Sequence, residues 1–142
     1  MKLDVEFVSR TESLFGKERF ACFAAALDLE PVISIRYNGN KHVADGVNKP
    51  VPWATDACYL PARPVFTADP LFHAGCYYVQ EASSMFVEQV LKTYVSSPVV
   101  MLDLCAAPGG KSTAARAVLP DGSLLVANEV MRNRVQILAE NL

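Results

Sequence analysis

Hydrophobic residues recur along the chain at two spacings, which predict a series of helices and strands. A helix is expected over residues 11–29, where one apolar face is formed by Phe20, Phe23, Ala24 and Leu27. A proline ends it, and a strand is expected at 32–36. A second helix is expected over 80–95, with an apolar stripe of Phe86, Val87, Val90, Leu91 and Tyr94. Ser83 or Ser84 is placed to cap its start.

The C-terminal part of the chain has the pattern of a βαβα unit, so the expected fold class is α/β. A strand is expected at 99–104, a helix that opens at Gly109-Gly110, a strand at 123–127 and a helix over 131–142. The strand at 99–104 is apolar throughout, which is typical of a parallel strand with a neighbouring strand at each edge. Two such strands alone would leave apolar surface exposed. Later strands, a second chain or the N-terminal module would have to cover it.

Five prolines between residues 50 and 70 divide the chain. They make a continuous helix or a central strand unfavourable there, because proline lacks an N–H donor; they are Pro50, Pro52, Pro61, Pro64 and Pro70. Apolar residues are interspersed among them, which indicates an extended, packed connector on the surface of a module. We expect two domains, residues 1–68 and residues 69–142.

Charge and cysteine content narrow the classes of site. The chain has 13 Lys and Arg against 15 Asp and Glu, so no basic stripe marks a nucleic-acid footprint. Arg36 and Lys41 could contact an RNA backbone, but solvated charges at a strand end are the more common case, and neither residue is assigned a role. The four cysteines form no C-x-x-C pair, and the spacing of His73 and Cys76 has no second pair beside it, so no metal site is expected. No signal peptide or membrane-spanning run is present, which favours a cytoplasmic protein with reduced thiols.

The turn after the strand at 99–104 is the best candidate for chemistry. Its Gly109-Gly110 pair lets a ligand approach the backbone, and the helix N-terminus behind it offers N–H groups to an anion. Cys105 stands where a phosphate-binding P-loop needs its first glycine, and a G-x-G-x-x-G fingerprint is incomplete. Glu129 lies 19 positions after Gly110, close to the spacing of an acidic residue that takes a ribose hydroxyl. An adenosine-type ligand is indicated, with an ordinary strand–turn–helix as the alternative.

Three stretches resemble the Sun-type (Nop/Sun) RNA cytosine-5 methyltransferases, which use S-adenosylmethionine. Residues 103–113, DLCAAPGGKST, resemble the first motif of that family, residues 75–85 its lead-in helix, and residues 127–134 its second motif. The resemblance implies a small N-terminal α/β module followed by the first βαβα part of a doubly wound, Rossmann-like methyltransferase sheet. It also implies cofactor binding by Cys105, Ala106, Ala107, Pro108, Gly109, Gly110, Lys111, Glu129 and Arg134.

The resemblance also implies roles for these residues. The loop backbone would surround the methionine and ribose, Lys111 would lie near the carboxylate of the ligand or a neighbouring acidic group, and Glu129 would accept both ribose hydroxyls. Gln80 and Glu81 would either orient the loop or simply begin their helix. Arg134 falls in the first turn of the last helix, where a cation is unfavourable, so a contact with the site is the better explanation for it.

No catalytic residue is assigned. In the family two cysteines act on the base, one adding to cytosine C6 and the other helping to release the product, and both lie in motifs beyond residue 142. The resemblance therefore implies RNA, ribosomal RNA in particular, as the partner of a full-length enzyme. This fragment alone is expected to be inactive, to bind cofactor weakly and to self-associate through its unfinished sheet. The alternative is a non-catalytic RNA- or protein-binding module that retains the fold.

Overall fold

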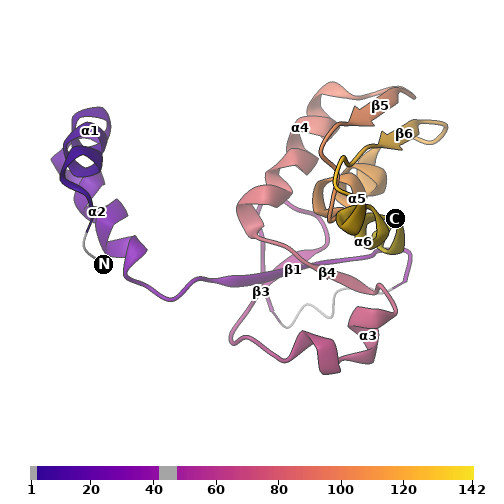
Figure 1. Ribbon diagram of the computed structural model, residues 1–142, viewed down its shortest axis with the longest axis horizontal. Helices are drawn as coiled ribbons and strands as arrows, with labels where there is room; N and C mark the ends of the chain where they lie inside the picture. Colours follow the sequence, from indigo (N-terminus) through magenta and orange to yellow (C-terminus); the bar gives the residue numbers. More distant parts are fainter. Residues whose placement is uncertain (1–2, 42–47) are drawn as a thin grey trace. The chain divides into compact units, whose positions relative to one another are not determined.

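The computed structural model describes residues 3–41 and 48–142, which fall into two units (Figure 1). The first unit ends at Val32, and the second spans Ile33–Leu142. Each unit has its own internal packing. The boundary expected at 68–69 stays a prediction about domains, although strands from both sides of it pair in one sheet.

The first unit is a pair of helices, α1 (Val5–Phe15) and α2 (Lys17–Leu27), so the prediction of one helix over 11–29 is wrong. Gly16 separates them at a φ of 79°, a left-handed conformation that glycine adopts without strain. The first helix begins early because the Asp4 carboxylate accepts hydrogen bonds from two N–H groups of its first turn, at 2.9 and 3.2 Å. The two helices meet through the ring of Phe23, which lies among Phe7, Phe15 and Phe20.

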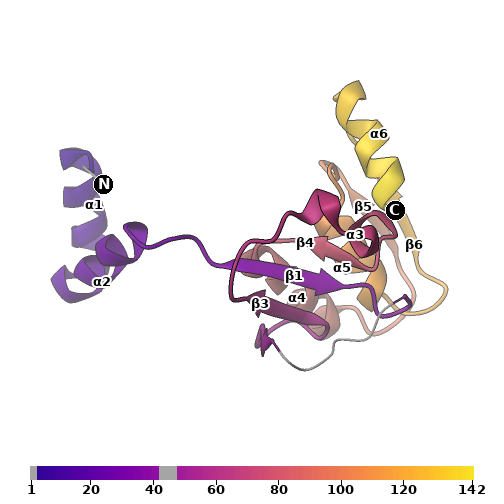
Figure 2. The same ribbon diagram turned by 90° about the horizontal axis from the view of Figure 1, so that it is seen from below.

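The second unit begins with a four-stranded antiparallel sheet in the order β2-β3-β1-β4. Its strands are β1 (Ile33–Tyr37), β2 (Lys49–Pro50), β3 (Ala57–Leu60) and β4 (Tyr77–Val79). Figure 2 shows β1 between β3 and β4. This confirms the strand expected at 32–36. One apolar cluster on this sheet is formed by Ile35, Tyr37, Cys58 and Phe66, and another by Val51, Ala54, Ala57, Ala82 and Met85.

The proline-rich segment does contain a central strand, contrary to the prediction for residues 50–70. The strand β3 pairs with β1 on one side and β2 on the other. The prolines avoid its interior: Pro50 lies on the edge strand, and Pro61 follows the last residue of β3. Proline costs no ladder hydrogen bond at either place, so the segment can join the sheet.

Short helices link two strands of the first sheet and then connect this sheet to the rest of the unit. The 3₁₀ helix η1 (Phe66–Ala68) and α3 (Pro70–His73) lead into β4. The 3₁₀ helix η2 (Ala82–Phe86) then continues as α4 (Val87–Tyr94), so the helix expected over 80–95 is present but starts with a 3₁₀ turn. The expected serine cap is wrong, because no side chain caps η2.

Two details of this helix differ from the pattern in the sequence. The Ser83 hydroxyl donates to the Glu81 carboxylate at 2.6 Å instead of capping backbone. Met85 and Glu88 are buried, whereas three members of the apolar stripe are exposed: Phe86 (54%), Val90 (44%) and Tyr94 (81%). The helix therefore packs through one face and leaves apolar side chains uncovered on another.

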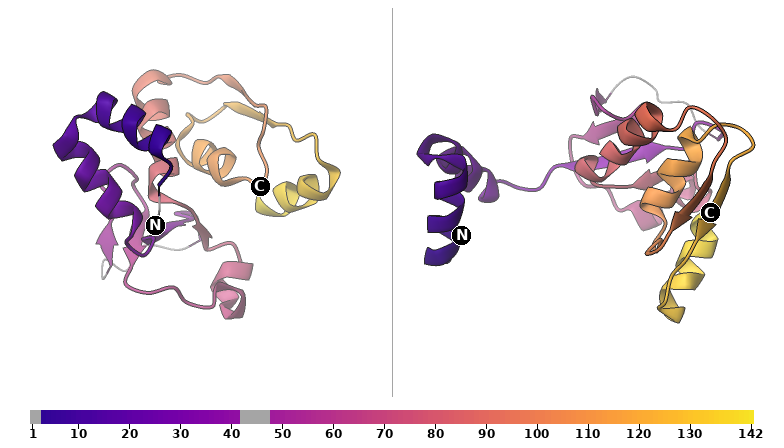
Figure 3. Two further views of the ribbon diagram at one scale, coloured as in Figure 1. Left: turned by 60° about the vertical axis from the view of Figure 1, so that its left-hand side comes forward. Right: turned by 90° about the horizontal axis from the view of Figure 1, so that it is seen from above.

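The unit ends in the expected βαβα pattern. Its elements are β5 (Val100–Asp103), α5 (Gly110–Val118), β6 (Leu124–Ala127) and α6 (Arg132–Asn141). The two strands pair in parallel, from Val100 opposite Leu124 to Asp103 opposite Ala127. Figure 3 shows α5 beside α4, and the two helices are in contact. This arrangement agrees with the predicted α/β class.

The parallel pair exposes large apolar side chains, as expected for two strands without further neighbours. Alternate residues point to solvent: Val100 (76% exposed), Leu102 (54%), Leu124 (57%) and Val126 (44%). No helix within the described ranges is long and apolar enough to cross a membrane.

Candidate functional site

The loop between β5 and α5 is fixed at both ends by one carboxylate. One oxygen of Asp103 accepts from the Cys105 N–H at 3.3 Å, and the other accepts from the Ser112 hydroxyl at 2.7 Å. Ser112 is only 1% exposed. Asp103 is therefore a loop-holding residue that the sequence-based site did not include, although a polar residue at the carboxyl end of an apolar strand was a usable signal.

Side chains from later elements hold the carbonyl groups of this loop. The Asn128 amide donates to the Leu104 carbonyl at 2.9 Å, the Arg134 guanidinium donates to the Ala107 carbonyl, and the Asn141 amide donates to the Pro108 carbonyl at 2.8 Å. The loop backbone is thus turned so that its acceptors face β6 and α6. The contacts of Asn141 were not predicted.

Gly109 is required at the end of this loop. Its φ is +113°, and a Cβ there would lie 3.2 Å from the Cβ of Asn141 and 3.5 Å from Leu138. Leu138 is itself buried against Ala106 and Ala107. The helix α6 therefore packs directly on the turn, and only a residue without a side chain fits between them.

The first turn of α5 has three N–H groups without an acceptor inside the helix. The N–H groups of Gly110, Lys111 and Ser112 precede the first intrahelical bond, which runs from Thr113 to the Gly109 carbonyl at 2.8 Å. The side chains of Lys111 and Cys105 are exposed beside them. Together with the helix dipole, this end suits a carboxylate or another anion.

Glu129 lies just beyond the carboxyl end of the neighbouring strand β6, with its side chain only 4% exposed. One carboxylate oxygen accepts from the Met131 N–H at 3.0 Å. The other lies 3.3 Å from the Arg134 guanidinium and accepts no hydrogen bond within the described part of the chain. A buried carboxylate oxygen with unused lone pairs is suited to a hydroxyl donor such as that of a ribose.

Arg134 has a geometric reason for its unfavourable place in the first turn of α6. It joins the loop carbonyl of Ala107 to the carboxylate of Glu129. The structure therefore brings Glu129, Arg134 and the loop together. In this arrangement Arg134 contacts both the Ala107 carbonyl and the Glu129 carboxylate, and it holds them in position relative to each other.

The sequence left the role of Arg36 open between an RNA contact and a solvated strand end. In the structure Arg36 is only 7% exposed and reaches the first turn of α5 from β1. Burial lowers the pKa of Arg36, and the negative charge of Glu88 opposes this shift. Its partner Gln80 is equally buried and lies against Gly110, which supports the interpretation that Gln80 orients the loop; Glu81 is exposed.

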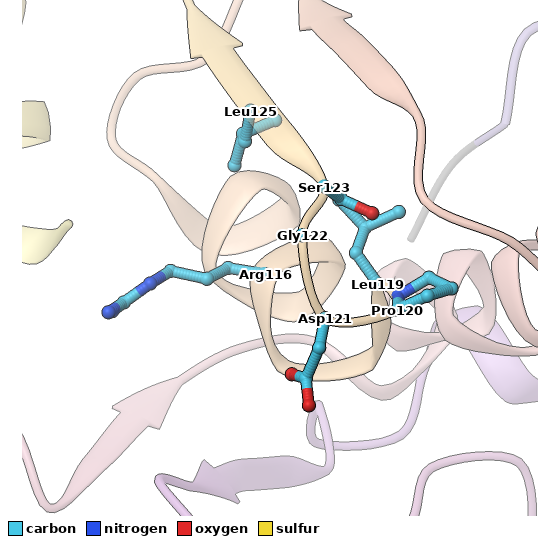
Figure 4. A pocket seen from close by; sticks show the side chains of 7 residues that line it. All are labelled: Arg116, Leu119, Pro120, Asp121, Gly122, Ser123 and Leu125. Atoms are coloured by element: carbon cyan, nitrogen blue, oxygen red, sulfur yellow. The ribbon is translucent and has the colours of Figure 1, made fainter.

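A small pocket of about 160 Å³ lies at the other end of the parallel pair (Figure 4). It is lined by Arg116, Leu119, Pro120, Asp121, Gly122, Ser123 and Leu125. These residues precede β6 or begin it, so the pocket lies at the amino end of that strand. Ligands of open α/β sheets bind at the carboxyl ends, where the loop after β5 and Glu129 lie.

The cysteines give no sign of a metal centre. Cys58 and Cys76 are buried, and Cys22 and Cys105 are exposed. Within residues 3–41 and 48–142, no group of three or more His, Cys, Asp or Glu side chains is arranged to hold a metal ion.

The sequence and the fold are both similar to those of known proteins. The family model for the N-terminal domain of 16S rRNA methyltransferase RsmF matches residues 3–82, and the model for 16S rRNA methyltransferase RsmB/F matches residues 89–142. Ribosomal RNA small subunit methyltransferase F is 35% identical over 95 residues in Shewanella frigidimarina and 38% identical over 96 residues in Shewanella oneidensis. Each match covers 66% of this chain and 20% of the relative, so the chain spans about a fifth of the curated relatives it matches.

Two solved structures confirm the fold class. The crystal structure of PH0851 has a TM-score of 0.78 at 23% identity, covering 95% of this chain and 32% of that one. A methyltransferase homolog protein from Pyrococcus horikoshii has a TM-score of 0.69 at 25% identity, covering 99% of this chain and 53% of that one.

Proposed function

We propose, since this chain belongs to the family of 16S rRNA methyltransferase RsmF, that it carries the S-adenosylmethionine site of an enzyme that methylates cytosine C5 in ribosomal RNA. The observation that carries the proposal is the buried, hydrogen-bond-free oxygen of Glu129 at the carboxyl end of β6, beside the loop after β5. When bound, S-adenosylmethionine supplies an activated methyl group on a sulfonium.

Different residues of the chain bind different parts of the ligand. Glu129 accepts hydroxyl protons of the ribose through the oxygen that accepts no hydrogen bond within the described residues, and the neighbouring Arg134 guanidinium orients that carboxylate. The backbone from Cys105 to Gly110, with its carbonyls held from behind, surrounds the ligand. Lys111 and the first N–H groups of α5 attract the carboxylate of the amino-acid part.

The residues that act on the base are not part of this proposal. Cys105 belongs to the cofactor loop, and no residue of this chain is assigned a catalytic role. A full-length protein that contains this chain would transfer the methyl group to ribosomal RNA in the cytoplasm. The exposed apolar residues of β5 and β6 favour self-association of the chain when it is studied alone.

The test is an NMR titration of this chain with S-adenosylhomocysteine. We expect weak binding, with a Kd of about 0.1–1 mM, and shifts centred on the loop and Glu129. Glu129→Ala should weaken binding at least about tenfold, or about 1.4 kcal/mol, whereas Glu140→Ala, an exposed carboxylate on α6, should leave it unchanged.

Two results would count against the proposal. If the loop signals do not shift at S-adenosylhomocysteine concentrations several times the expected Kd, this chain does not contain the cofactor site. Equal effects of the two alanine variants would remove the role of Glu129. If the chain instead bound RNA and no cofactor, the alternative of a non-catalytic RNA-binding module would replace the enzyme.

A further inference from the structure

One buried cation of the first sheet contacts the first turn of α5. The Arg36 Nε donates to the Gln80 side-chain oxygen at 3.1 Å, and a terminal nitrogen donates to the Thr113 hydroxyl at 2.5 Å. The same nitrogen lies 3.4 Å from the Gly110 carbonyl. A planar guanidinium can serve all three acceptors at once, which a lysine ammonium on a flexible stem cannot do with the same geometry.

We propose that Arg36 is a positioning residue for the cofactor-binding turn, acting from β1 through Thr113 and Gly110. The inference rests on the proposed function, since it assigns the turn to S-adenosylmethionine. It goes beyond that function because it gives the N-terminal sheet a part in cofactor binding. Arg36 itself need not touch the ligand.

The Arg36 contacts continue into the turn. The Thr113 hydroxyl, which accepts from Arg36, donates to the Gly109 carbonyl at 2.8 Å. Gly109 is the residue whose left-handed conformation ends the loop. A change at Arg36 is therefore transmitted by two successive hydrogen bonds to the point where the loop becomes a helix.

Helix stability alone does not explain a cation in this place. Arg36 contacts the N-terminal turn of α5, where positive charge opposes the helix dipole. Its contacts in this turn and at Gln80 are neutral oxygens, and the nearby carboxylate of Glu88 is occupied by Lys92 and Thr55. The positive charge becomes favourable when an anionic group binds at this helix end.

Gln80 supplies an independent observation. The side-chain oxygen of Gln80 accepts a hydrogen bond from Arg36. The side-chain nitrogen of Gln80 is buried and has no hydrogen-bond partner among the described residues. It lies 3.6 Å from the place where a Cβ of Gly110 would stand. Arg36 therefore also determines which end of the Gln80 amide is next to the turn.

The experiment measures amide hydrogen exchange and S-adenosylhomocysteine affinity in the 142-residue chain and two variants, Arg36→Lys and Arg36→Met. Arg116→Met, an exposed arginine in the last turn of α5, is the matched control. The reporting amides are those of Thr113 and Ala114, whose acceptors are the Gly109 and Gly110 carbonyls. The reference amide is Leu119, at the other end of the helix.

We expect exchange at Thr113 and Ala114 to rise at least about tenfold more than exchange at Leu119 in both Arg36 variants. Affinity should fall at least about fivefold, and Arg116→Met should change neither quantity. Arg36→Lys keeps the positive charge, so it still tests the positioning role of Arg36 if Arg36→Met does not fold.

Other outcomes separate the two proposals. A uniform rise in exchange, or none, would overturn the positioning role, because a merely structural arginine would loosen all amides together. Selective exchange with unchanged affinity would overturn it too. Selective exchange in a chain that binds no S-adenosylhomocysteine would support the control of the turn by Arg36 and count against the proposed function.

Discussion

The two sheets of the second unit reverse the usual relation between hydrophobicity and burial. The strand β1 carries Ser34 and Arg36, yet these are 3% and 7% exposed. The strands β5 and β6 are almost wholly apolar, yet Val100 and Leu102 are 76% and 54% exposed. The polar strand lies inside a four-stranded sheet, and the apolar strands form a pair with only one covered face.

The difference shows what holds each region together. The antiparallel sheet is stabilised by buried apolar clusters, one of which includes Ile35. Around the parallel pair the buried residues are mainly small, such as Ala106 and Ala107 in the loop and Ala114 in α5, and the loop is held by side-chain hydrogen bonds to backbone. The apolar residues of β5 and β6 are suited to a larger sheet, supplied by a further segment or by a second chain.

The strongest test of this comparison is a pair of truncations to alanine. Ile35→Ala should lower the free energy of unfolding by about 2–5 kcal/mol, because it leaves a cavity in the first sheet. Leu102→Ala should cost less than about 1 kcal/mol, because that side chain is already half in water. Urea denaturation followed by circular dichroism measures both. Similar losses would show that the parallel pair has a core of its own.

The second test concerns backbone in the loop after β5. Gly109→Ala should destabilise the chain by about 1–3 kcal/mol from backbone strain, with a further loss from the contact with Asn141. Gly122→Ala is the control, since its φ is also positive, at 86°, but its Cβ would meet nothing closer than 3.7 Å. Denaturation should therefore rank Gly109→Ala as the more damaging change. The opposite rank would mean that α6 does not pack on the turn.

The third test concerns the buried carboxylate of Glu88 on α4, which contacts Thr55 and Lys92. Burial alone would raise the pKa of Glu88, but hydrogen bonds from Lys92 and Thr55 outweigh it and hold the pKa below its ordinary value of 4.5. A lowered folded-state pKa means that the carboxylate stabilises the fold above pH 4.5 and loses this effect as the pH falls through the folded-state value.

Glu88→Gln should therefore cost about 1.5 kcal/mol at pH 7, and the difference from the unmodified chain should shrink below pH 4.5. Denaturant titrations at a series of pH values measure it, with Glu140→Gln as an exposed control. A difference independent of pH would contradict the assignment of the effect to this carboxylate.

The smallest effect is expected at Asn141, whose amide holds the Pro108 carbonyl. Asn141→Ala should lower stability by only about 1 kcal/mol, because the site is exposed and water replaces the lost donor. Exchange of loop amides should nevertheless rise more than exchange in β1. An unchanged loop would show that Arg134 and Leu138 hold α6 on the loop without Asn141.

The sequence predicted the elements whose pattern is local. The βαβα order, the helix start at Gly110 and the place of Glu129 beyond β6 follow from apolar runs and glycine spacing within a few residues. The break at Gly16 was missed, since a single glycine inside an apolar pattern is compatible with a continuous helix.

The rest depends on contacts between distant residues. Arg36 looks like a solvated strand end until Gln80 and the first turn of α5 lie against it, and the role of Asn141 depends on a carbonyl 33 positions earlier. The strand β3 was missed because prolines on both sides hide four residues that pair well. Glu129 could be proposed from spacing, but its link through Arg134 to the Ala107 carbonyl could not.

The contacts between α6 and the loop after β5 have a consequence for the synthesis of the protein. The residues that hold Ala107, Pro108 and Gly109 are Arg134, Leu138 and Asn141, which the ribosome adds later than the loop itself. A nascent chain that has just completed β5 and α5 contains the loop sequence but lacks these three contacts. We therefore expect the turn to reach the conformation described here only after the second strand and its helix have been made.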